Sequence, residues 1–410
     1  DEICSGAVID TNTSFIALHL EDEGIAVRRH GCVGDDVSDI SSVLKEISGR
    51  SEIAVITGGL GPTDDDVTAK AVALAAGVEL ALNEEALNYI KTFFKKRKFV
   101  YTSADKKQAL LPVGSVCISN PIGTAPGFYT KIEECTFYCL PGVPHEMRRM
   151  LTKDVLPSIR KMALFSGQSA LKKLITIFGI GEANVAERLN RFESIFPNLS
   201  LGLCAEFPEI TVRVRARQNS NDADPLAIED AARWIERRLE GRILSMKGQS
   251  MAEVVGNLLR RRNSTVGVAE SCTGGLIAKM LTDVAGSSDY FNRSAVTYTN
   301  RSKVSILGVD SGTIERCGAV HEETAAEMAE GVRLKSEADY GLSTTGIAGP
   351  TGGSVDKPVG TVCIGLSSHS GTKARRYQFR FGNRGLNKKI FAFTALNMLR
   401  RRLIKRKADQ

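Results

Sequence analysis

Apolar and polar positions in the first part of the chain fall into blocks typical of alternating strands and helices. Apolar residues at 15, 16, 18 and 20 follow helical spacing and predict a helix over residues 12–23. The apolar run 52–57 ends in glycines, as a buried strand does, and the alanine-rich stretch 66–76 predicts a helix that ends at Gly77. A further helix and two strands are predicted over residues 84–98, 115–118 and 136–140. This order favours a parallel sheet with helices on both faces.

The middle of the chain has a different pattern, which predicts a small α+β domain. The predicted order is a strand, a helix, a hairpin of two strands and a second helix, over residues 172–178, 183–196, 199–206, 209–217 and 225–239. The second helix carries the only tryptophan of the chain, Trp234, which we expect in the core. Residues 241–249 have the composition of a linker.

The last third returns to alternating helices and strands. We predict helices over residues 250–262, 273–283, 322–335 and 387–407, and strands over residues 265–269, 294–299, 340–345, 359–366 and 377–381. The changes in pattern divide the chain into three domains, residues 1–165, 166–245 and 246–410. The fold class is therefore α/β for the two outer domains, with a small α+β domain between them.

The composition is that of a soluble globular protein. The 410 residues include 42% hydrophobic and 25% charged residues, enough for two or three domains with cores of their own. No apolar run approaches the ~18 residues that span a bilayer, and we find no signal peptide, so we expect no membrane partner. The chain begins with Asp1 and not with methionine, from which we expect further residues upstream.

The cysteines indicate the cellular compartment, and the charge distribution indicates which partners are expected. The nine cysteines are an odd number without a CxxC pair, which disfavours a zinc site of that spacing and a secreted disulfide framework and favours a reducing cytoplasm. The net charge of +7 is mild, and much of it lies in residues 95–98 and 400–407. This distribution indicates solvated helix ends. It permits an anionic ligand but does not favour nucleic-acid binding.

The stretch AESCTGG, residues 269–275, lies between an apolar strand and an apolar helix. A nucleophile at such a junction is held at the carboxyl edge of the sheet, where it faces the N–H groups and dipole of the helix. Ser271 and Cys272 are both candidates, and chemistry alone favours the cysteine, because a thiolate forms readily near a helix N-terminus. The alternative is a tight turn with Thr273 as the helix N-cap.

Two further segments of the same domain carry candidate chemistry. Tyr298 and Lys303 lie just beyond a predicted strand; a lysine desolvated near a serine can act as a general base, and a tyrosine can relay a proton. The glycine-rich run TGIAGP, residues 345–350, precedes Lys357 and offers N–H groups that suit a phosphate. It is not a Walker P-loop, because no GK[ST] follows at the required spacing. A plain turn is the alternative.

The amino-terminal third has a candidate site of its own in GGLGPTDDDVT, residues 58–68. Glycines let a backbone approach a ligand closely, and the carboxylates that follow can hold a divalent metal or a cationic heterocycle. A helix cap explains the same residues equally well. The turns over residues 123–127 and 141–147 also follow predicted strands.

Taken together, the carboxy-terminal motifs resemble the carboxy-terminal domain of the CinA family of competence/damage-inducible proteins. AESCTGG, TYTN with Lys303, GAV at 318–320, TGIAGPTGG and KPVGTV follow the family's order. The resemblance implies an amidohydrolase of pyridine-nucleotide salvage that converts nicotinamide mononucleotide and water to nicotinate mononucleotide and ammonia without a metal or redox cofactor. It also implies that Ser271 is the nucleophile and that Lys303 and Tyr298 assist.

The same resemblance makes the neighbouring residues candidate ligands of the substrate. N–H groups near Ser271 and Gly274 are expected to stabilise the oxyanion. The residues expected to hold the mononucleotide are Thr273, Gly274, Gly275, Thr345, Gly346, Gly349 and Lys357.

The amino-terminal motifs resemble the amino-terminal domain of this family, which is related to the molybdopterin-binding fold of the MoaB and MogA proteins. Asp66 matches the aspartate of GGxGxxxxD, and DEICSG at residues 1–6 matches GDELLxG without its first glycine, which predicts a strand before residue 1. Members with this domain are associated with metal-dependent hydrolysis of ADP-ribose at its pyrophosphate. The corresponding site residues are Gly58, Gly59, Gly61, Thr63, Asp65, Asp66, Gly142 and Glu146, with Asp65 and Asp66 as ligands of a divalent metal.

The middle domain resembles the family's KH-like domain in the order of its elements. A KH module that binds nucleic acid uses a GxxG loop, whereas GIGEA at residues 179–183 departs from this pattern and carries an acid, which favours a structural or dimerisation role. We therefore expect a homodimeric enzyme that acts on a small nucleotide. One alternative is a scaffold that binds a nucleotide or pterin near DNA-uptake or recombination proteins. Nucleic-acid binding is a third option, which predicts a steep salt dependence.

Overall fold

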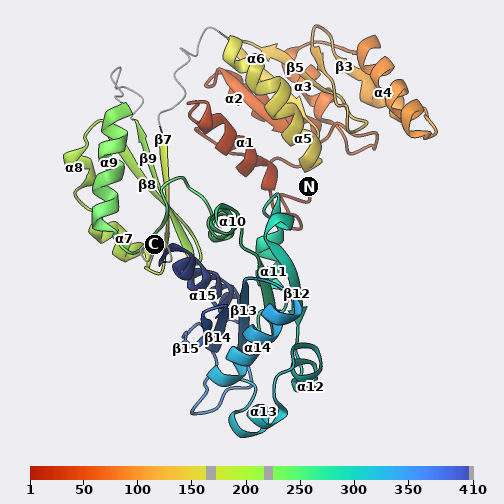
Figure 1. The fold of residues 1–410 in the computed structure, drawn as a ribbon. Helices are drawn as coiled ribbons and strands as arrows, with labels where there is room; N and C mark the ends of the chain where they lie inside the picture. Colours follow the sequence, from red (N-terminus) through yellow and green to blue (C-terminus); the bar gives the residue numbers. More distant parts are fainter. Residues whose placement is uncertain (163–171, 217–224, 406–410) are drawn as a thin grey trace. The chain divides into compact units, whose positions relative to one another are not determined.

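The computed structural model describes residues 1–162, 172–216 and 225–405, and the chain forms two compact units, Asp1–Ala170 and Leu171–Gln410 (Figure 1). The predicted domain boundary between residues 165 and 166 and the predicted helix end at residue 407 lie outside the described residues. Within the described ranges, no helix is long and apolar enough to cross a membrane.

The amino-terminal unit contains a four-stranded sheet in the order β1-β6-β5-β4, with bounds Ile53–Thr57, Cys135–Leu140, Gly127–Ile132 and Val116–Ile118. β1 and β6 are parallel, whereas β6 with β5 and β5 with β4 are antiparallel. The expectation of a parallel sheet is therefore wrong for this unit. The reason is local: β5 and β6 are joined by a short turn at residues 133–134, which permits only antiparallel pairing.

Two apolar clusters lie on the two faces of this sheet, and β6 contributes to both. Phe137 and Cys139 pack with α2, α3 and α4, and Tyr138 and Leu140 pack with α1, α5 and α6, as strand alternation requires. The helices are α1 (Thr11–Asp22), α2 (Val37–Ser48), α3 (Thr68–Ala76), α4 (Glu84–Arg97), α5 (Pro144–Met150) and α6 (Leu156–Lys161). A small antiparallel pair is formed by β2 (Leu80–Leu82) and β3 (Leu110–Pro112).

The middle domain is an antiparallel sheet in the order β10-β7-β9-β8, with bounds Ile243–Ser245, Lys172–Phe178, Glu209–Ala216 and Leu199–Glu206. Its helices are α7 (Glu182–Arg188), α8 (Phe192–Ile195) and α9 (Pro225–Arg238). Trp234 on α9 is half-buried and meets Phe192 edge-on at a centroid distance of 6.0 Å, so it lies at the margin of the core.

Two predictions for this domain are wrong. The single helix expected over residues 183–196 is two short helices, interrupted near Asn190, a residue of low helix propensity. The expected linker 241–249 contains β10, because Ile243 pairs with Ile177 at the edge of β7 and Leu244 is buried in the apolar cluster of the next domain.

The carboxy-terminal domain is a five-stranded sheet in the order β12-β11-β13-β14-β15, with bounds Phe291–Val296, Val266–Glu270, Tyr340–Gly346, Thr361–Ser368 and Gly371–Gln378. β12, β11 and β13 are parallel, and β14 and β15 are added in antiparallel pairing. The predicted strand 377–381 is displaced because β14 and β15 form a tight hairpin, and Phe379 and Phe381 pack against the core beyond the strand end.

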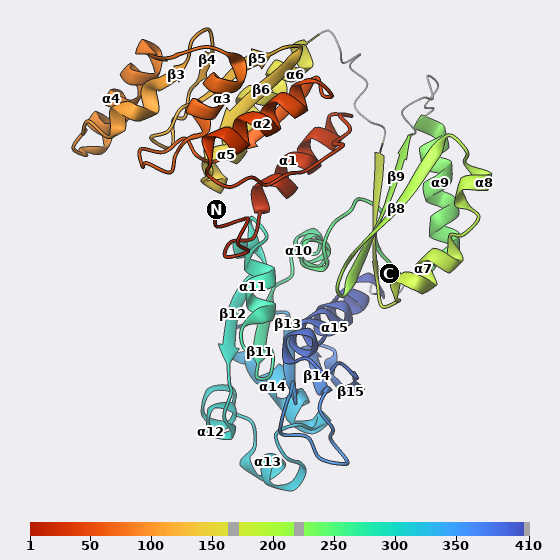
Figure 2. The same cartoon turned by 180° about the vertical axis from the view of Figure 1, so that it is seen from behind.

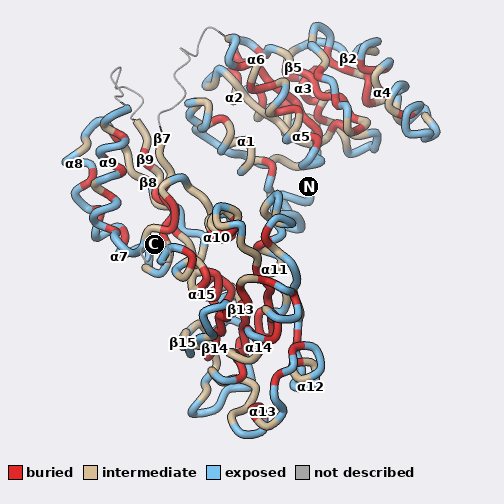
Figure 3. Tube along the Cα trace, in the orientation of Figure 1, coloured by how far each residue is buried: buried red, intermediate tan, exposed pale blue. Residues whose placement is uncertain are grey.

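Helices cover both faces of this sheet. α10 (Met251–Arg261), α11 (Leu276–Thr282) and α15 (Arg384–Lys405) pack into one apolar cluster, and α14 (Glu322–Lys335) packs into another. The strands between them are buried, β11 and β14 along their whole length (Figure 3). The short helices α12 (Asn300–Ser302) and α13 (Ser311–Cys317) follow β12 at the carboxyl edge of the sheet (Figure 2).

The middle and carboxy-terminal domains contact each other within the second unit. The rings of Phe178 and Phe393 stack at a centroid distance of 6.1 Å. Glu209 Oε1 accepts a hydrogen bond of 2.8 Å from the N–H of Met251, the first residue of α10. Burial raises the pKa of the Glu209 carboxyl to about 7, and the nearby Glu206 carboxylate contributes in the same direction.

Because its folded pKa lies above the ordinary value of 4.5, Glu209 holds a proton more tightly in the folded unit than in the unfolded chain. Stability is therefore lost as pH rises from about 4.5 to about 7. We expect Glu209→Gln, which keeps an oxygen for the Met251 N–H, to raise the free energy of unfolding by roughly 2 kcal/mol at pH 8 and by much less at pH 5. Urea unfolding of the full chain at both pH values checks this.

The control is Glu206→Gln, because Glu206 is a neighbouring carboxylate whose side chain is 89% exposed. It should change stability little at either pH. An equal effect of Glu209→Gln at pH 5 and pH 8 would contradict the assigned titration.

Candidate active site

The turn over residues 271–275 joins β11 to α11 and carries both candidate nucleophiles. Gly274 and Gly275 have φ angles of 61° and 93°, in the left-handed region that disfavours other residues, so the glycines allow the chain to turn here. Ser271 and Cys272 come immediately before them, at the carboxyl end of a strand with a parallel neighbour on each side.

The buried carboxylate of Glu270 fixes this turn against the helix. It accepts hydrogen bonds from the N–H groups of Gly275 (2.9 Å), Ile277 (3.2 Å) and Ala278 (2.9 Å). The positive end of the helix dipole favours a carboxylate at this place. The alternative, with Thr273 as the N-cap, is wrong, because the N-cap is Gly275 and the fully buried Thr273 hydroxyl lies 2.7 Å from the hydroxyl of Thr344. That hydroxyl is equally unavailable to a substrate.

Because the Glu270 carboxylate accepts the N–H groups at the start of α11, those groups cannot stabilise an oxyanion, and other donors must be considered. The Ser271 N–H donates to the Thr344 carbonyl at 3.0 Å, and the Gly274 N–H donates to the Ser271 carbonyl at 3.1 Å. The two donors expected from the sequence are therefore already used. No oxygen of the described residues accepts from the N–H groups of Cys272 and Thr273. Thr273 is fully buried, so the N–H of Cys272 is the nearer candidate. It directly follows the serine, where a strand–turn–helix nucleophile has one of its oxyanion donors.

Ser271 and Lys303 are brought together although they are far apart in the sequence. Lys303 Nζ donates to Ser271 Oγ at 3.1 Å and to the carbonyl of Thr297 at 2.9 Å. Lys303 begins the π-helical turn η4 (Lys303–Leu307) and is only 1% exposed. Burial lowers the pKa of its amine below the ordinary 10.5, which increases the fraction that is neutral and able to accept a proton.

The second candidate nucleophile lies in a different environment. Cys272 is 5% exposed and packs into the apolar cluster of the domain. Burial raises the pKa of its thiol to about 12, so the thiol stays protonated at neutral pH. The structure thus favours the serine, which has an amine beside it, over the cysteine, which chemistry alone favoured.

Tyr298 lies apart from this pair, on the exposed side of the same edge. Its side chain is 58% exposed, and its hydroxyl accepts a hydrogen bond of 2.8 Å from Arg384. The same guanidinium donates to the Gly349 carbonyl at 2.8 Å. Arg384 therefore joins Tyr298 to the glycine-rich loop, and no hydrogen bond between Tyr298 and Ser271 is found among the described residues.

Two basic residues of α15 were missed in the sequence. A Cβ added to Gly274 would lie 3.4 Å from Lys388 Nζ, so this amine lies beside the turn over residues 271–275, which we call the nucleophile turn. Arg384 and Lys388 are four residues apart and share one face of α15. In the sequence, the one indication of these two residues is their four-residue spacing at the start of the last helix. No sequence pattern near that helix relates it to residues 271–275.

The glycine-rich loop is fastened to the turn between α13 and α14. Thr345 is buried, and its hydroxyl donates to the Ala319 carbonyl at 2.7 Å. Lys357 Nζ donates to the Cys317 carbonyl at 2.8 Å. Gly346 ends β13, and Gly349 has a φ of 83°. The side chains of Thr345 and Lys357 thus position the loop, and its glycine backbone is the part that can face a ligand.

The amino-terminal candidates divide into two groups. The Asp66 carboxylate accepts from the N–H and hydroxyl of Thr63 at 2.9 and 2.6 Å, and Lys107 donates to the Thr63 carbonyl. Glu146 is instead buried and accepts from the Asn120 side chain at 2.6 Å. A Cβ on Gly142 would lie 3.3 Å from the Cα of Gly58, so these glycines allow two loops to approach closely.

The amino-terminal carboxylates are the residues predicted to bind a divalent metal. Hydrogen bonding to Thr63 lowers the pKa of the exposed Asp65 carboxyl, which keeps it charged. Within the described ranges, the single cluster of three side chains able to hold a metal is Cys317, His321 and Glu323, which includes neither Asp65, Asp66 nor Glu146. The amino-terminal carboxylates therefore do not fit a metal that needs three protein ligands.

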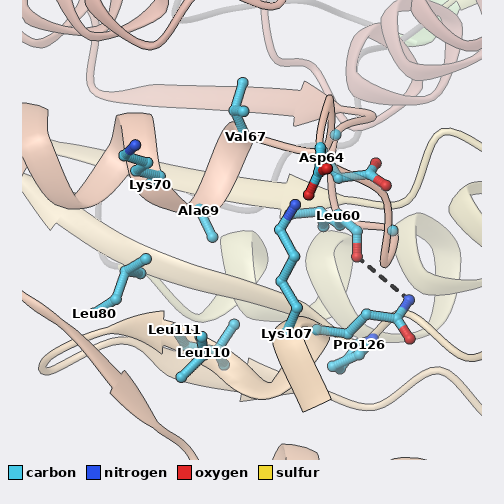
Figure 4. Close-up of a pocket in the computed structure, with 14 residues that line it drawn as sticks. Leu60, Asp64, Val67, Ala69, Lys70, Leu80, Lys107, Leu110, Leu111 and Pro126 are labelled. Carbon is cyan, nitrogen blue, oxygen red and sulfur yellow. Dashed lines mark hydrogen bonds between the residues drawn. The ribbon is translucent and has the colours of Figure 1, made fainter. Parts of the chain in front are cut away.

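A cavity of about 210 Å³ adjoins the first amino-terminal group (Figure 4). The glycine loop at Gly59 and Gly61, with Asp66, lines one side, and Leu80 and Leu111 line another. Lys70 and Lys107 also line it, and Figure 4 shows Lys107 extending toward Asp64. The cavity combines an apolar floor with two cations.

Comparisons with known proteins match all three domains. The matching family models are the probable molybdopterin binding domain over residues 1–161, the damage-inducible protein CinA KH domain over residues 172–244 and the CinA C-terminal domain over residues 248–403. A CinA-like protein of Desulfosudis oleivorans is 47% identical over 405 residues, which cover 98% of each chain. One of Desulforapulum autotrophicum is 43% identical over 408 residues, 98% of this chain and 96% of its own.

The chain is also similar to solved structures. A competence/damage inducible protein from Agrobacterium tumefaciens is 39% identical, with 38% of this chain and 97% of that chain covered and a TM-score of 0.35.

Proposed function

This chain belongs to the CinA family, and from that premise we propose that its carboxy-terminal domain is a serine amidohydrolase acting on the carboxamide of nicotinamide mononucleotide. The observation that carries the proposal is the 3.1 Å hydrogen bond between the buried Lys303 amine and Ser271 Oγ. A buried lysine beside a serine is costly for a scaffold to keep, and it provides a base for acyl transfer. The products are nicotinate mononucleotide and ammonia.

The reaction proceeds in two halves. Ser271 Oγ attacks the carboxamide carbon while Lys303 takes the hydroxyl proton, and the N–H group of Cys272 stabilises the oxyanion. The C–N bond then breaks, and the nitrogen leaves as ammonia with the proton from Lys303. Water next attacks the ester carbon while Lys303 takes one of its protons. Lys303 then returns that proton to Ser271 Oγ as the ester bond breaks, which releases the acid and restores the serine hydroxyl and the neutral amine.

The remaining side chains hold the substrate in this scheme. Arg384 and Lys388 supply the positive charge for the phosphate of the mononucleotide, with N–H groups of the loop containing Gly346 and Gly349. Tyr298 accepts a hydrogen bond from Arg384 and keeps its own O–H, so in this scheme it holds the departing nitrogen by a hydrogen bond while Lys303 supplies the proton. This half of the proposal needs no metal or redox cofactor.

Ammonia release from nicotinamide mononucleotide by the full chain tests the assignment. We expect Ser271→Ala to lower kcat/KM by at least roughly 10³-fold and Lys303→Met by roughly 10²-fold or more. Cys272→Ala is the matched control, since it removes the neighbouring thiol and leaves the serine and lysine, and it should retain activity within a few-fold. Full activity in Ser271→Ala would refute the serine mechanism. A native chain that releases no ammonia would favour the scaffold alternative.

The pH dependence follows from the direction of the Lys303 shift. Because the neutral amine is the base, kcat/KM should rise with pH through the free-enzyme pKa of Lys303 and then level off below the 10.5 of an ordinary lysine. This rise can be measured in a profile of kcat/KM above pH 7, where the substrate phosphate is already ionised and does not contribute to the pH dependence. Activity that falls with rising pH, or that still rises at 10.5, would contradict a neutral buried base.

We propose a second site in the amino-terminal domain, where the cavity holds part of a nucleotide such as ADP-ribose. The cavity of about 210 Å³ is smaller than the ~300 Å³ or more of a drug-sized site, so it suits one end of such a ligand. Lys70 and Lys107 would face the diphosphate. The family association with ADP-ribose hydrolysis requires a divalent metal, and we assign no step through it, because the carboxylates present do not gather around one point.

Calorimetric titration of the full chain with ADP-ribose tests this binding. Lys107→Ala should weaken it roughly tenfold, because it removes one charged hydrogen bond to phosphate. Lys131→Ala is the control, since this exposed lysine lies on β5 and does not line the cavity. Equal weakening by both variants would indicate a general charge effect and no site at the cavity.

A further inference from the structure

Three potential metal ligands converge at the turn between α13 and α14. Cys317 Sγ, a ring nitrogen of His321 and a carboxylate oxygen of Glu323 all lie within 4.8 Å of one another, the one such group in the part of the chain that the structure describes. None of these residues takes part in the proposed amide chemistry. We propose that they form a binding site for a borderline divalent transition-metal ion, Zn²⁺ above all.

The chemistry of the donors selects the class of metal. Thiolate and imidazole together favour Zn²⁺ and related ions, whereas Mg²⁺ and Ca²⁺ require oxygen ligands. Three protein ligands leave a fourth tetrahedral position open for water or another external ligand. The carboxylate and thiolate would offset the charge of the ion.

The backbone prearranges the three side chains. Cys317 ends α13, and the φ of 83° at Gly318 turns the chain immediately after it. His321 is the N-cap of α14, where its Nδ1 accepts the N–H of Glu323 at 3.2 Å. A metal on Nδ1 would replace that hydrogen bond and leave the Nε2 proton on the side of the Glu322 carboxylate, now 4.0 Å away. Such an outer carboxylate commonly orients a ligating histidine.

Contacts beyond the turn also hold it in place. The Cys317 and Ala319 carbonyls accept from Lys357 and Thr345, and the Gly318 carbonyl accepts from the hydroxyl of Thr324 at 2.9 Å. An ion would therefore meet ligands whose backbone is already ordered, which lowers the cost of binding.

A cation already occupies this part of the cluster. The Arg316 guanidinium lies 2.5 Å from Glu323 Oε2 and also interacts with Cys317, and both interactions raise the pKa of Arg316. The side chains of Arg316 and Glu323 are 62% and 51% exposed, so the arginine can swing into solvent. A divalent ion would take its place between the thiolate and the carboxylate. Arg316 is thus a competitor for the site, and its removal should strengthen metal binding.

Cobalt titration of the full, reduced chain tests the proposal, with Zn²⁺ as the displacing ion. A thiolate–Co²⁺ charge-transfer band reports the cysteine directly. Because Cys4 and Cys32 place two further sulfurs 2.9 Å apart, the titration uses a Cys4→Ser/Cys32→Ser background. We expect a band that saturates at one Co²⁺ per chain and disappears with Zn²⁺.

Variants of the cluster separate this site from adventitious binding. Cys317→Ser should abolish the band, and His321→Asn, which can still cap α14, should weaken binding at least about tenfold. Arg316→Gln should tighten it several-fold. Cys204→Ser, at an exposed cysteine of β8, is the control and should leave the band intact. A band that survives Cys317→Ser, or the absence of stoichiometric binding, would overturn the proposal.

Discussion

The nucleophile turn depends on one buried group, the carboxylate of Glu270. It is fully buried, and a carboxylate out of water costs several kcal/mol unless it is hydrogen-bonded. The N–H groups of the first turn of α11 supply those bonds, so β11 and α11 must meet in one geometry. Ser271 is fixed as a consequence, and the N–H of Cys272, directly after it, has no oxygen partner among the described residues. The helix end stabilises the protein's own carboxylate and not the substrate.

The second buried charged-type residue at this turn is Lys303, which lies beside Ser271 as Glu270 lies beside α11. Its amine has two described oxygen partners, a serine hydroxyl and the Thr297 carbonyl, and neither carries a charge. An ammonium ion there would lose most of its hydration without an opposite charge, so burial lowers the pKa of Lys303 and raises the fraction of neutral amine. Such a residue violates the usual rules for a stable core, which is typical of functional positions.

Local patterns in the sequence predicted the elements better than their pairing. The helix 322–335 has the bounds of α14 because an acidic first turn and basic last turn mark its ends. In the amino-terminal sheet the antiparallel strand β5 was not predicted, and the turn between β5 and β6 carries no glycine or asparagine to indicate a hairpin. In the site, AESCTGG and Lys303 were visible as motifs, whereas Arg384 and Lys388 reach it from a helix more distant in the chain. Glu270 was visible as a letter of that motif, but its role as the carboxylate that accepts the N–H groups of α11 was not predicted.

The two cysteines of the site region show why residue type alone does not decide chemistry. Cys272 follows a strand at a helix start, a place that commonly activates thiols. Here Glu270 already uses the N–H groups of that helix, and the thiol packs among apolar side chains, so its pKa rises to about 12. Cys317 ends a short helix in no recognisable motif, yet it is half-buried beside a guanidinium, an imidazole and a carboxylate. The motif AESCTGG therefore contains a thiol that stays protonated, whereas Cys317 is the thiol with charged neighbours. Solvent access and neighbouring charge, and not the motif, determine what each sulfur can do.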